Sequence, residues 1–190
     1  CQMNVHDSEK IAGMFELDGM IKANSEENAD VLFINTCTIR ENADDKLYGT
    51  LGQLKQWKSK QTDRKLLVGG CAAQKDKTLV RDRAPWVDVV LGTHNLTNII
   101  NLLNQSEDWG PLTEVVDEIE QMPTDAPSIR ESESSAWVTI QIGCNNSCTF
   151  CIVPSVRGPE ISRRPGDIIN EAKLLVDSGV KEITLLGQNV

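Results

Sequence analysis

The sequence has no long apolar run and no secretory signal. No stretch approaches the ~20 consecutive apolar residues that a membrane-spanning helix needs, and the first residues lack the charged and apolar regions of a signal peptide. The composition, with 39% hydrophobic and 25% charged residues, is that of an ordinary globular protein. We therefore expect a soluble protein without a membrane partner.

Histidine is scarce as well, whereas cysteine is not. The chain has two histidines, His6 and His94, and six cysteines. Without extracellular features, these cysteines argue against a disulfide framework and for reduced thiols in the cytoplasm, where clustered cysteines more often bind metal. We therefore expect a cytoplasmic protein whose metal ligands are thiolates, and we interpret the two histidines as local hydrogen-bonding or surface residues.

Positive charge is in deficit, with a net charge of -9, but the deficit is local. Residues 106–135 contain nine acidic residues and one basic residue, whereas the remaining sequence has 18 basic and 19 acidic residues. The acidic total therefore does not exclude an RNA substrate. The same segment contains a serine cluster and three prolines, Pro111, Pro123 and Pro127, which together predict an interdomain linker. We interpret its acidic charge as that of a solvated connector without a specific role.

Before this linker, predicted strands alternate with predicted helices. Apolar patterning predicts strands at residues 30–35, 65–70 and 87–91, and helices over residues 38–60, 74–81 and 95–104. An earlier helix is expected to start at the capping residues Asp7 and Ser8. This order predicts an α/β domain with a doubly wound parallel sheet. The crossover through the first helix leads us to expect a further strand before Cys1.

After the linker, residues 137–142 alternate as a strand does. A helix is expected from a cap near Asp167 to a stop at Gly179, followed by a strand at residues 181–186. One such unit cannot bury its own apolar faces, so we expect the start of a truncated (β/α) barrel that continues beyond the last residue. The predicted organisation is an N-terminal domain over residues 1–105, the acidic linker over 106–135 and the barrel start over 136–190.

Three cysteines stand close together in the stretch CNNSCTFC, directly after the strand at 137–142. The thiolates of Cys144, Cys148 and Cys151 can converge on one metal centre. The lack of a fourth cysteine predicts an open coordination position, which a reactive iron–sulfur cluster needs and a structural site avoids. Zinc is the main rival, but zinc sites usually show paired CxxC elements or cysteine with histidine. A non-enzymatic, zinc-stabilised binding module remains the alternative.

The other cysteines, Cys1, Cys37 and Cys71, are spaced by 36 and 34 residues, which is close to one strand–helix unit each. Cys37 and Cys71 directly follow predicted strands, and Cys1 would follow the expected earlier strand. Because the carboxyl ends of parallel strands build the ligand site of such a sheet, we expect these three thiols on one rim. The alternative is that Cys37 and Cys71 are ordinary buried cysteines at strand ends.

Longer strings narrow the interpretation. The CxxxCxxC loop with Phe150 before its last cysteine resembles the radical S-adenosylmethionine superfamily, whose barrel carries a cluster loop after its first strand. Within that superfamily the chain is similar to the methylthiotransferases, through Cys1-Gln2-Met3-Asn4 with Asp7-Ser8, Asn35-Thr36-Cys37 with Arg40-Glu41-Asn42-Ala43, Gly70-Cys71 with Ala73-Gln74, Gly143-Cys144-Asn145-Asn146 and Arg157-Gly158-Pro159-Glu160-Ile161-Ser162-Arg163. Gln2-Met3 and the string from Arg40 to Ala43 favour the branch that modifies tRNA.

The resemblance implies two 4Fe–4S clusters and S-adenosyl-L-methionine as cofactors. The implied ligands are Cys144, Cys148 and Cys151 for the radical cluster, whose fourth iron binds S-adenosylmethionine, and Cys1, Cys37 and Cys71 for an auxiliary cluster, which holds the sulfur to be transferred. Residues implied to contact S-adenosylmethionine are Phe150, Gly187 and Gln188.

The resemblance also implies a substrate, N6-isopentenyladenosine at position 37 of tRNA, next to the anticodon. One S-adenosylmethionine would methylate the sulfur and another would supply the radical that removes hydrogen from C2, with an electron donor and a sulfur source as partners. Arg157, Arg163 and Arg164 would contact RNA phosphate or a cofactor carboxylate, or form surface ion pairs. Family members have a complete barrel and an RNA-binding TRAM domain, so this chain is not expected to be active by itself. Methylthiolation of a ribosomal protein is the alternative activity.

Overall fold

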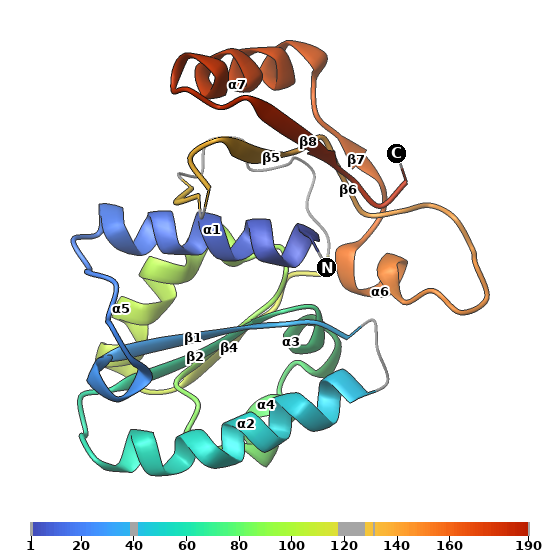
Figure 1. Cartoon of the computed structure of the whole chain (residues 1–190). Coiled ribbons are helices and arrows are strands. Elements are labelled where there is room, and N and C mark those ends of the chain that lie inside the picture. Colours follow the sequence, from blue (N-terminus) through green and yellow to red (C-terminus); the bar gives the residue numbers. More distant parts are fainter. Residues whose placement is uncertain (1, 39–41, 118–127, 131, 190) are drawn as a thin grey trace.

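The computed structural model describes residues 2–38, 42–117, 128–130 and 132–189. Its first part is built on a sheet of four parallel strands in the order β1-β2-β3-β4 (Figure 1). The strands are β1 (Val31–Thr36), β2 (Lys65–Gly70), β3 (Val89–Leu91) and β4 (Leu112–Glu114). The alternation of strands and helices in the sequence thus correctly predicts a parallel α/β sheet.

Helices cover both faces of this sheet. On one face lie α2 (Asn42–Ser59), α3 (Cys71–Asp76) and α4 (Leu79–Arg83), and on the other α1 (Gln2–Leu17) and α5 (Ile99–Trp109), with the short turns η1 (Glu26–Asn28) and η2 (Leu96–Asn98) before β1 and α5. Successive residues of β2 serve the two faces: Leu66 and Val68 pack with α2, whereas Leu67 packs with α5. Complete burial of each such side chain stabilises the folded state by roughly 1.5–3 kcal/mol.

The predicted start of the first helix is wrong. α1 begins at Gln2, so Asp7 and Ser8 lie inside the helix and do not cap it. Both side chains have tertiary partners instead. The Ser8 hydroxyl accepts a hydrogen bond from the Asn35 side-chain amide at 2.9 Å, and the Asp7 carboxylate forms an ion pair with Arg157. Residue types that favour helix caps are thus used here to join elements.

Two further boundaries, and the burial of one strand, differ from the prediction. The helix predicted over residues 74–81 is two helices, α3 and α4, because Lys77 adopts a φ of +50° and ends the first one. The helix predicted over 95–104 is α5, which follows η2 and continues to Trp109. The apolar run at residues 30–35 is typical of a strand buried on both faces. The residues of β1 are instead mostly half-buried, since β1 is an outer strand of the described sheet.

Part of the segment predicted as a linker lies within the N-terminal fold. α5 continues to Trp109, and β4 pairs with β3 through the partners Leu91 and Glu114. The Glu114 carboxylate accepts hydrogen bonds from the side-chain amides of Asn95 and Asn98, at 2.7 and 3.1 Å. Residues 118–127 and 131 lie outside the described residues, and the division at 105 and 135 stays a prediction.

The second part holds a parallel strand–helix–strand unit, as expected for the start of a barrel. β5 (Ser135–Thr139) pairs with β8 (Glu182–Leu186), and α7 (Pro165–Asp177) packs on β5. The strand predicted over 137–142 is interrupted at Ile140, after which β6 (Gln141–Ile142) pairs antiparallel with β7 (Ile161–Ser162). Arg164 occupies the N-cap position of α7 without a side-chain capping bond, and Asp167 lies in the first turn. No helix among the described residues is long and apolar enough to cross a membrane.

α1 lies between the four-stranded sheet and the second part (Figure 1). Ile11 packs in the core with the sheet, whereas His6 and Lys10 experience the charge of Arg163 from the second part.

The pKa of His6 is lowered to about 3, by burial first and then by the charges of Lys10 and Arg163. The Glu9 carboxylate, 3.6 Å from Nδ1, acts in the opposite direction and is outweighed. His6 is therefore neutral in the folded chain at neutral pH.

The neutral, buried His6 should make the chain sensitive to mild acid. In the unfolded chain its pKa returns to 6.5, so the unfolded state binds a proton that the folded state does not. This group should lower the free energy of unfolding by roughly 2 kcal/mol between about pH 7 and about pH 5. Urea denaturation at each pH measures the loss. A His6→Gln variant should show a smaller pH dependence by that amount, and equal pH dependences would contradict the assignment.

Gly70 should be intolerant of substitution. Its φ is +93°, and a Cβ at this position would lie 2.5 Å from both the Asn35 side-chain oxygen and the Thr36 carbonyl oxygen. Gly70→Ala should therefore destabilise the chain by at least ~1–3 kcal/mol. Gly52→Ala is the matched control, because Gly52 lies in α2 with nothing within 4 Å, and it should stabilise by about 0.5–1 kcal/mol. Coincident urea midpoints for the two variants would overturn this account.

Candidate metal centres

Cys37 and Cys71 follow neighbouring strands that end side by side. In the register of β1 and β2, Thr36 pairs with Gly70, so the next residue of each strand leaves the sheet at the same level. Cys71 is 3% exposed and is the first residue of α3, whereas Cys37 is half-buried. The structure therefore brings these two predicted ligands to one rim. Cys1, the predicted third ligand, lies outside the described residues.

A reciprocal amide pair ties the start of α1 to this rim. Asn4 Nδ2 donates to Asn35 Oδ1 at 2.6 Å, and Asn35 Nδ2 donates to the Asn4 carbonyl at 2.6 Å. Asn4 Nδ2 also donates to the Thr36 carbonyl at 3.0 Å. These bonds hold the first turn of α1 against the end of β1.

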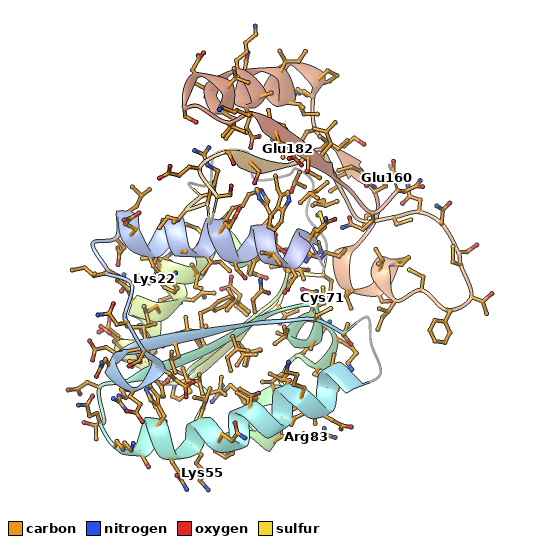
Figure 2. All side chains as sticks on the ribbon, viewed as in Figure 1. Lys22, Lys55, Cys71, Arg83, Glu160 and Glu182 are labelled. Carbon is orange, nitrogen blue, oxygen red and sulfur yellow. The ribbon has the colours of Figure 1, made fainter. Side chains whose placement is uncertain are left out.

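Thr36 organises the turn that carries Cys71. Its buried hydroxyl donates to the Gly69 carbonyl at 2.6 Å and accepts from the N–H groups of Ala72 and Ala73, at 3.1 and 3.3 Å. It thereby satisfies backbone amides in the first turn of α3 that would otherwise lack a partner. Figure 2 shows Cys71 at this end of the sheet.

The CNNSCTFC loop begins with a sharp turn at Gly143. This residue has a φ of +72°, and a Cβ there would lie 2.0 Å from the Pro159 carbonyl oxygen, so glycine is required. The N–H of the next residue, Cys144, donates to the Gly158 carbonyl at 3.2 Å, and Cys144 is buried. The first cysteine of the loop is thus fixed by the backbone of residues 158–159.

The three loop cysteines are not gathered around one point. Cys148 and Cys151 are exposed, and no group of three or more His, Cys, Asp or Glu side chains in the described part of the chain could hold a metal ion. The donor set nevertheless fits an iron–sulfur cluster. The Asn146 N–H already donates to Cys144 Sγ at 3.5 Å, a type of bond that cluster thiolates receive. Binding a cluster would therefore bring the two exposed thiols toward Cys144.

Neither histidine joins a described cysteine set. His6 is buried in α1, and His94 lies near the base of the loop, where a Cβ on Gly158 would be 3.4 Å from its Nε2. His94 is therefore closer to the loop in space than its sequence position suggests. Phe150, a predicted contact of S-adenosylmethionine, is 99% exposed.

Gln141 links the start of the loop to the turn that follows β8. Its buried side chain donates to the Gly143 carbonyl at 2.7 Å, and its Oε1 accepts from the N–H groups of Gln188 and Asn189, at 2.8 and 3.2 Å. The predicted contact residues Gly187 and Gln188 are thereby held beside the cysteine loop. The sequence gives no signal for this bridge, because one polar residue in an alternating strand resembles any other.

Arg157 joins the two cysteine-bearing parts. It ends α6 (Val153–Arg157), its side chain is 7% exposed, and its guanidinium donates to Asp7 Oδ2 at 2.7 Å. Burial alone would lower the pKa of Arg157, but Asp7 and Cys71 together hold it above its ordinary value. α6 packs against α3 near the start of α1 (Figure 1). The two cysteine sets therefore lie on adjoining parts of the molecule.

Arg163 is likewise an internal residue. Its side chain is 6% exposed, pairs with Glu171 and donates to the Thr139 carbonyl at 2.9 Å. Two of the three arginines weighed as RNA or cofactor contacts thus form ion pairs, but within the protein and not at its surface. Arg164 is exposed.

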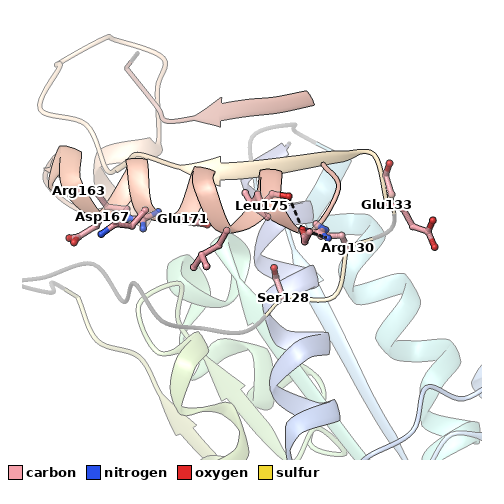
Figure 3. Close-up of a pocket in the computed structure, with 11 residues that line it drawn as sticks. Ser128, Arg130, Glu133, Arg163, Asp167, Glu171 and Leu175 are labelled. Atoms are coloured by element: carbon pink, nitrogen blue, oxygen red, sulfur yellow. Dashed lines mark hydrogen bonds and ion pairs between the residues drawn. The ribbon is translucent and has the colours of Figure 1, made fainter. Parts of the chain in front are cut away.

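A groove of about 720 Å³ lies between residues 128–130 and 132–133 on one side and α7 on the other (Figure 3). Its described lining is mainly polar and includes Arg130, Arg163 and Glu171. None of the described lining residues is a cysteine, so the groove belongs to neither candidate centre.

Comparisons with known proteins match both parts. Residues 1–92 match the uncharacterized protein family UPF0004, and residues 138–190 match the radical SAM superfamily. Proteins named tRNA-2-methylthio-N(6)-dimethylallyladenosine synthase are similar over 100% of this chain, with 56% identity in Tropheryma whipplei, 54% in Corynebacterium urealyticum and 53% in Corynebacterium efficiens. The chain spans 40%, 35% and 36% of the lengths of these relatives. The chain is thus similar to the radical SAM superfamily in its second part and, over its whole length, to part of proteins named as tRNA methylthio synthases.

Proposed function

We propose that this chain is the N-terminal part of an enzyme that methylthiolates C2 of N6-isopentenyladenosine at position 37 of tRNA, beside the anticodon. The observation that carries the proposal is the presence of two cysteine sets on adjoining parts of a chain whose relatives are named as tRNA-2-methylthio-N(6)-dimethylallyladenosine synthases. Because the chain spans only part of those relatives, the activity belongs to the whole protein, and we expect this piece to be inactive alone.

Two 4Fe–4S clusters are the cofactors that fit the cysteine sets. Their proposed ligands are Cys144, Cys148 and Cys151 for the cluster that binds S-adenosylmethionine, and Cys1, Cys37 and Cys71 for the auxiliary cluster. When bound, the first supplies the electron that cleaves S-adenosylmethionine and the second supplies sulfur. Each set of three cysteines would leave one iron without a thiolate from that set, which is the open position that both roles need.

The residues around the loop would position S-adenosylmethionine. Gln141 holds the backbone of Gln188 and Asn189 beside the loop, which orients the turn that we propose for the methionine amino group. Gly187 and Gln188 lie in this turn and are half-buried. Phe150 is exposed and would contribute its ring to the same site only when the loop closes.

The partners follow from the chemistry. Replacing the C2 hydrogen by a methylthio group requires an electron donor and a source of sulfur, besides the tRNA that carries the modified adenosine. We place the enzyme in the cytoplasm, where reduced thiols persist. The rival functions are methylthiolation of a ribosomal protein and a zinc-stabilised binding module.

Metal content distinguishes the enzyme from the zinc module. After anaerobic reconstitution with iron and sulfide, the chain should hold about eight irons, because each set of three cysteines binds one cluster. Replacing Cys1, Cys37 and Cys71 together by alanine should reduce this to about four, and so should replacing Cys144, Cys148 and Cys151. Iron analysis and charge-transfer absorption measure the content. Stoichiometric zinc without such absorption would reject both cluster assignments.

The choice of substrate is tested with the full-length protein. Incubation with S-adenosylmethionine, a reductant, sulfide and tRNA carrying N6-isopentenyladenosine should add one sulfur and one methyl group to that nucleoside. Mass analysis of digested tRNA detects the product, and tRNA with unmodified adenosine at the same position is the control. Activity on ribosomal protein with none on tRNA would select the other branch of the family.

A further inference from the structure

Three consecutive residues, Val156, Arg157 and Gly158, contact both cysteine-bearing parts. The Val156 carbonyl accepts a hydrogen bond from the Thr93 hydroxyl at 2.7 Å, and the Gly158 carbonyl accepts from the Cys144 N–H at 3.2 Å. Between them, the Arg157 side chain reaches into the first part. The end of α6 is therefore the place where the fixed end of the cysteine loop meets the rim that carries Cys71.

The Arg157 guanidinium lies among three elements. Asp7 of α1 accepts its hydrogen bond at 2.7 Å, and the two side chains are 7% and 13% exposed. α6 packs against α3, and Cys71, the first residue of α3, lies close enough to the guanidinium to help raise the pKa of Arg157. A guanidinium has five N–H donors in one plane, so it can serve a carboxylate and a sulfur at once. Asp7 thus orients the group that faces Cys71.

We propose that Arg157 is a positioning residue that sets the separation of the two cysteine sites and places a permanent positive charge beside Cys71. The inference rests on the proposed function, since it takes Cys71 as a cluster ligand. Arginine stays protonated at any physiological pH, and a buried charge is little screened by salt. The Asp7 carboxylate offsets part of this charge.

This arrangement has a signature that a purely structural contact lacks. Reduction adds negative charge to a cluster, so a nearby positive charge favours the reduced form and a nearby negative charge disfavours it. Loss of the Arg157 charge should therefore make the reduction potential of the auxiliary cluster more negative. Loss of the Asp7 charge should make it less negative.

The test uses the full-length enzyme with Cys144, Cys148 and Cys151 replaced by alanine, so that only the auxiliary cluster is loaded. Its one-electron reduction by dithionite is followed by EPR-monitored titration. We expect a more negative potential for Arg157→Met, a nearly unchanged one for Arg157→Lys and a less negative one for Asp7→Asn. Arg163→Met is the matched control, because Arg163 is equally buried and ion-paired but shares no contact with a described cysteine, and it should leave the potential unchanged.

The separation of the two cysteine sites is measured in the full-length enzyme that holds both clusters. The magnetic coupling between the reduced clusters should weaken in Arg157→Met and persist in Arg163→Met. Full iron loading with equal potentials in these two variants overturns the inference. Failure of the parent protein to load iron at all counts against the proposed function instead. If Arg157→Met does not fold, the comparison of Asp7→Asn with Arg157→Lys decides: a less negative potential in the first and a nearly unchanged one in the second support the proposal, and equal potentials in both refute it.

Discussion

The parallel register of β1 and β2 is the constraint on which the candidate centres depend. It places Thr36 opposite Gly70, and therefore Cys37 beside Cys71. Gly70 permits the close approach of the two strand ends, and the Thr36 hydroxyl then anchors the first turn of α3. A slip of one residue would turn each side chain of a strand to the opposite face and separate the thiols. Docking of α6 against α3 relies on the same register, because Cys71 begins that helix.

A second constraint is the polar face of α1. A helix that packs on a sheet normally shows its polar side to water, but here that side meets the second part of the chain. His6 is neutral and buried, and burial lowers the pKa of Lys10 although the charges of Asp7 and Glu171 oppose this. Asp7 forms its buried ion pair with Arg157. Such groups contribute orientation more than stability, because each has few geometries in which it is satisfied. The polar face of α1 therefore specifies how the second part sits.

Sequence reasoning found what short-range patterns encode. The strand–helix alternation and the parallel sheet follow from apolar periodicity, and the position of Cys37 and Cys71 on one rim follows from their spacing. The ligand roles of the six cysteines stay a prediction. The features that such patterns do not predict depend on residues far apart in the chain. Asp7 has the local sequence pattern of a helix cap, yet its partner Arg157 lies in α6. Gln141 looks like an ordinary strand residue until the turn after β8 is placed beside it. No local pattern reports such contacts, since they exist only after the two parts have packed.

The two candidate centres share one physical design in spite of their different folds. In each, one thiol is held by the fold: Cys71 by the start of α3, and Cys144 by the backbone of residues 158–159. Cys148 and Cys151, by contrast, are exposed on the loop. A metal centre assembled from one fixed and several adaptable ligands couples binding to the ordering of its loop. The fixed thiols, and not the exposed ones, would therefore determine where the two proposed clusters lie relative to each other. Arg157 and Gly158 connect these two fixed points through adjacent residues, so the geometry between the sites is set by a single short stretch of chain.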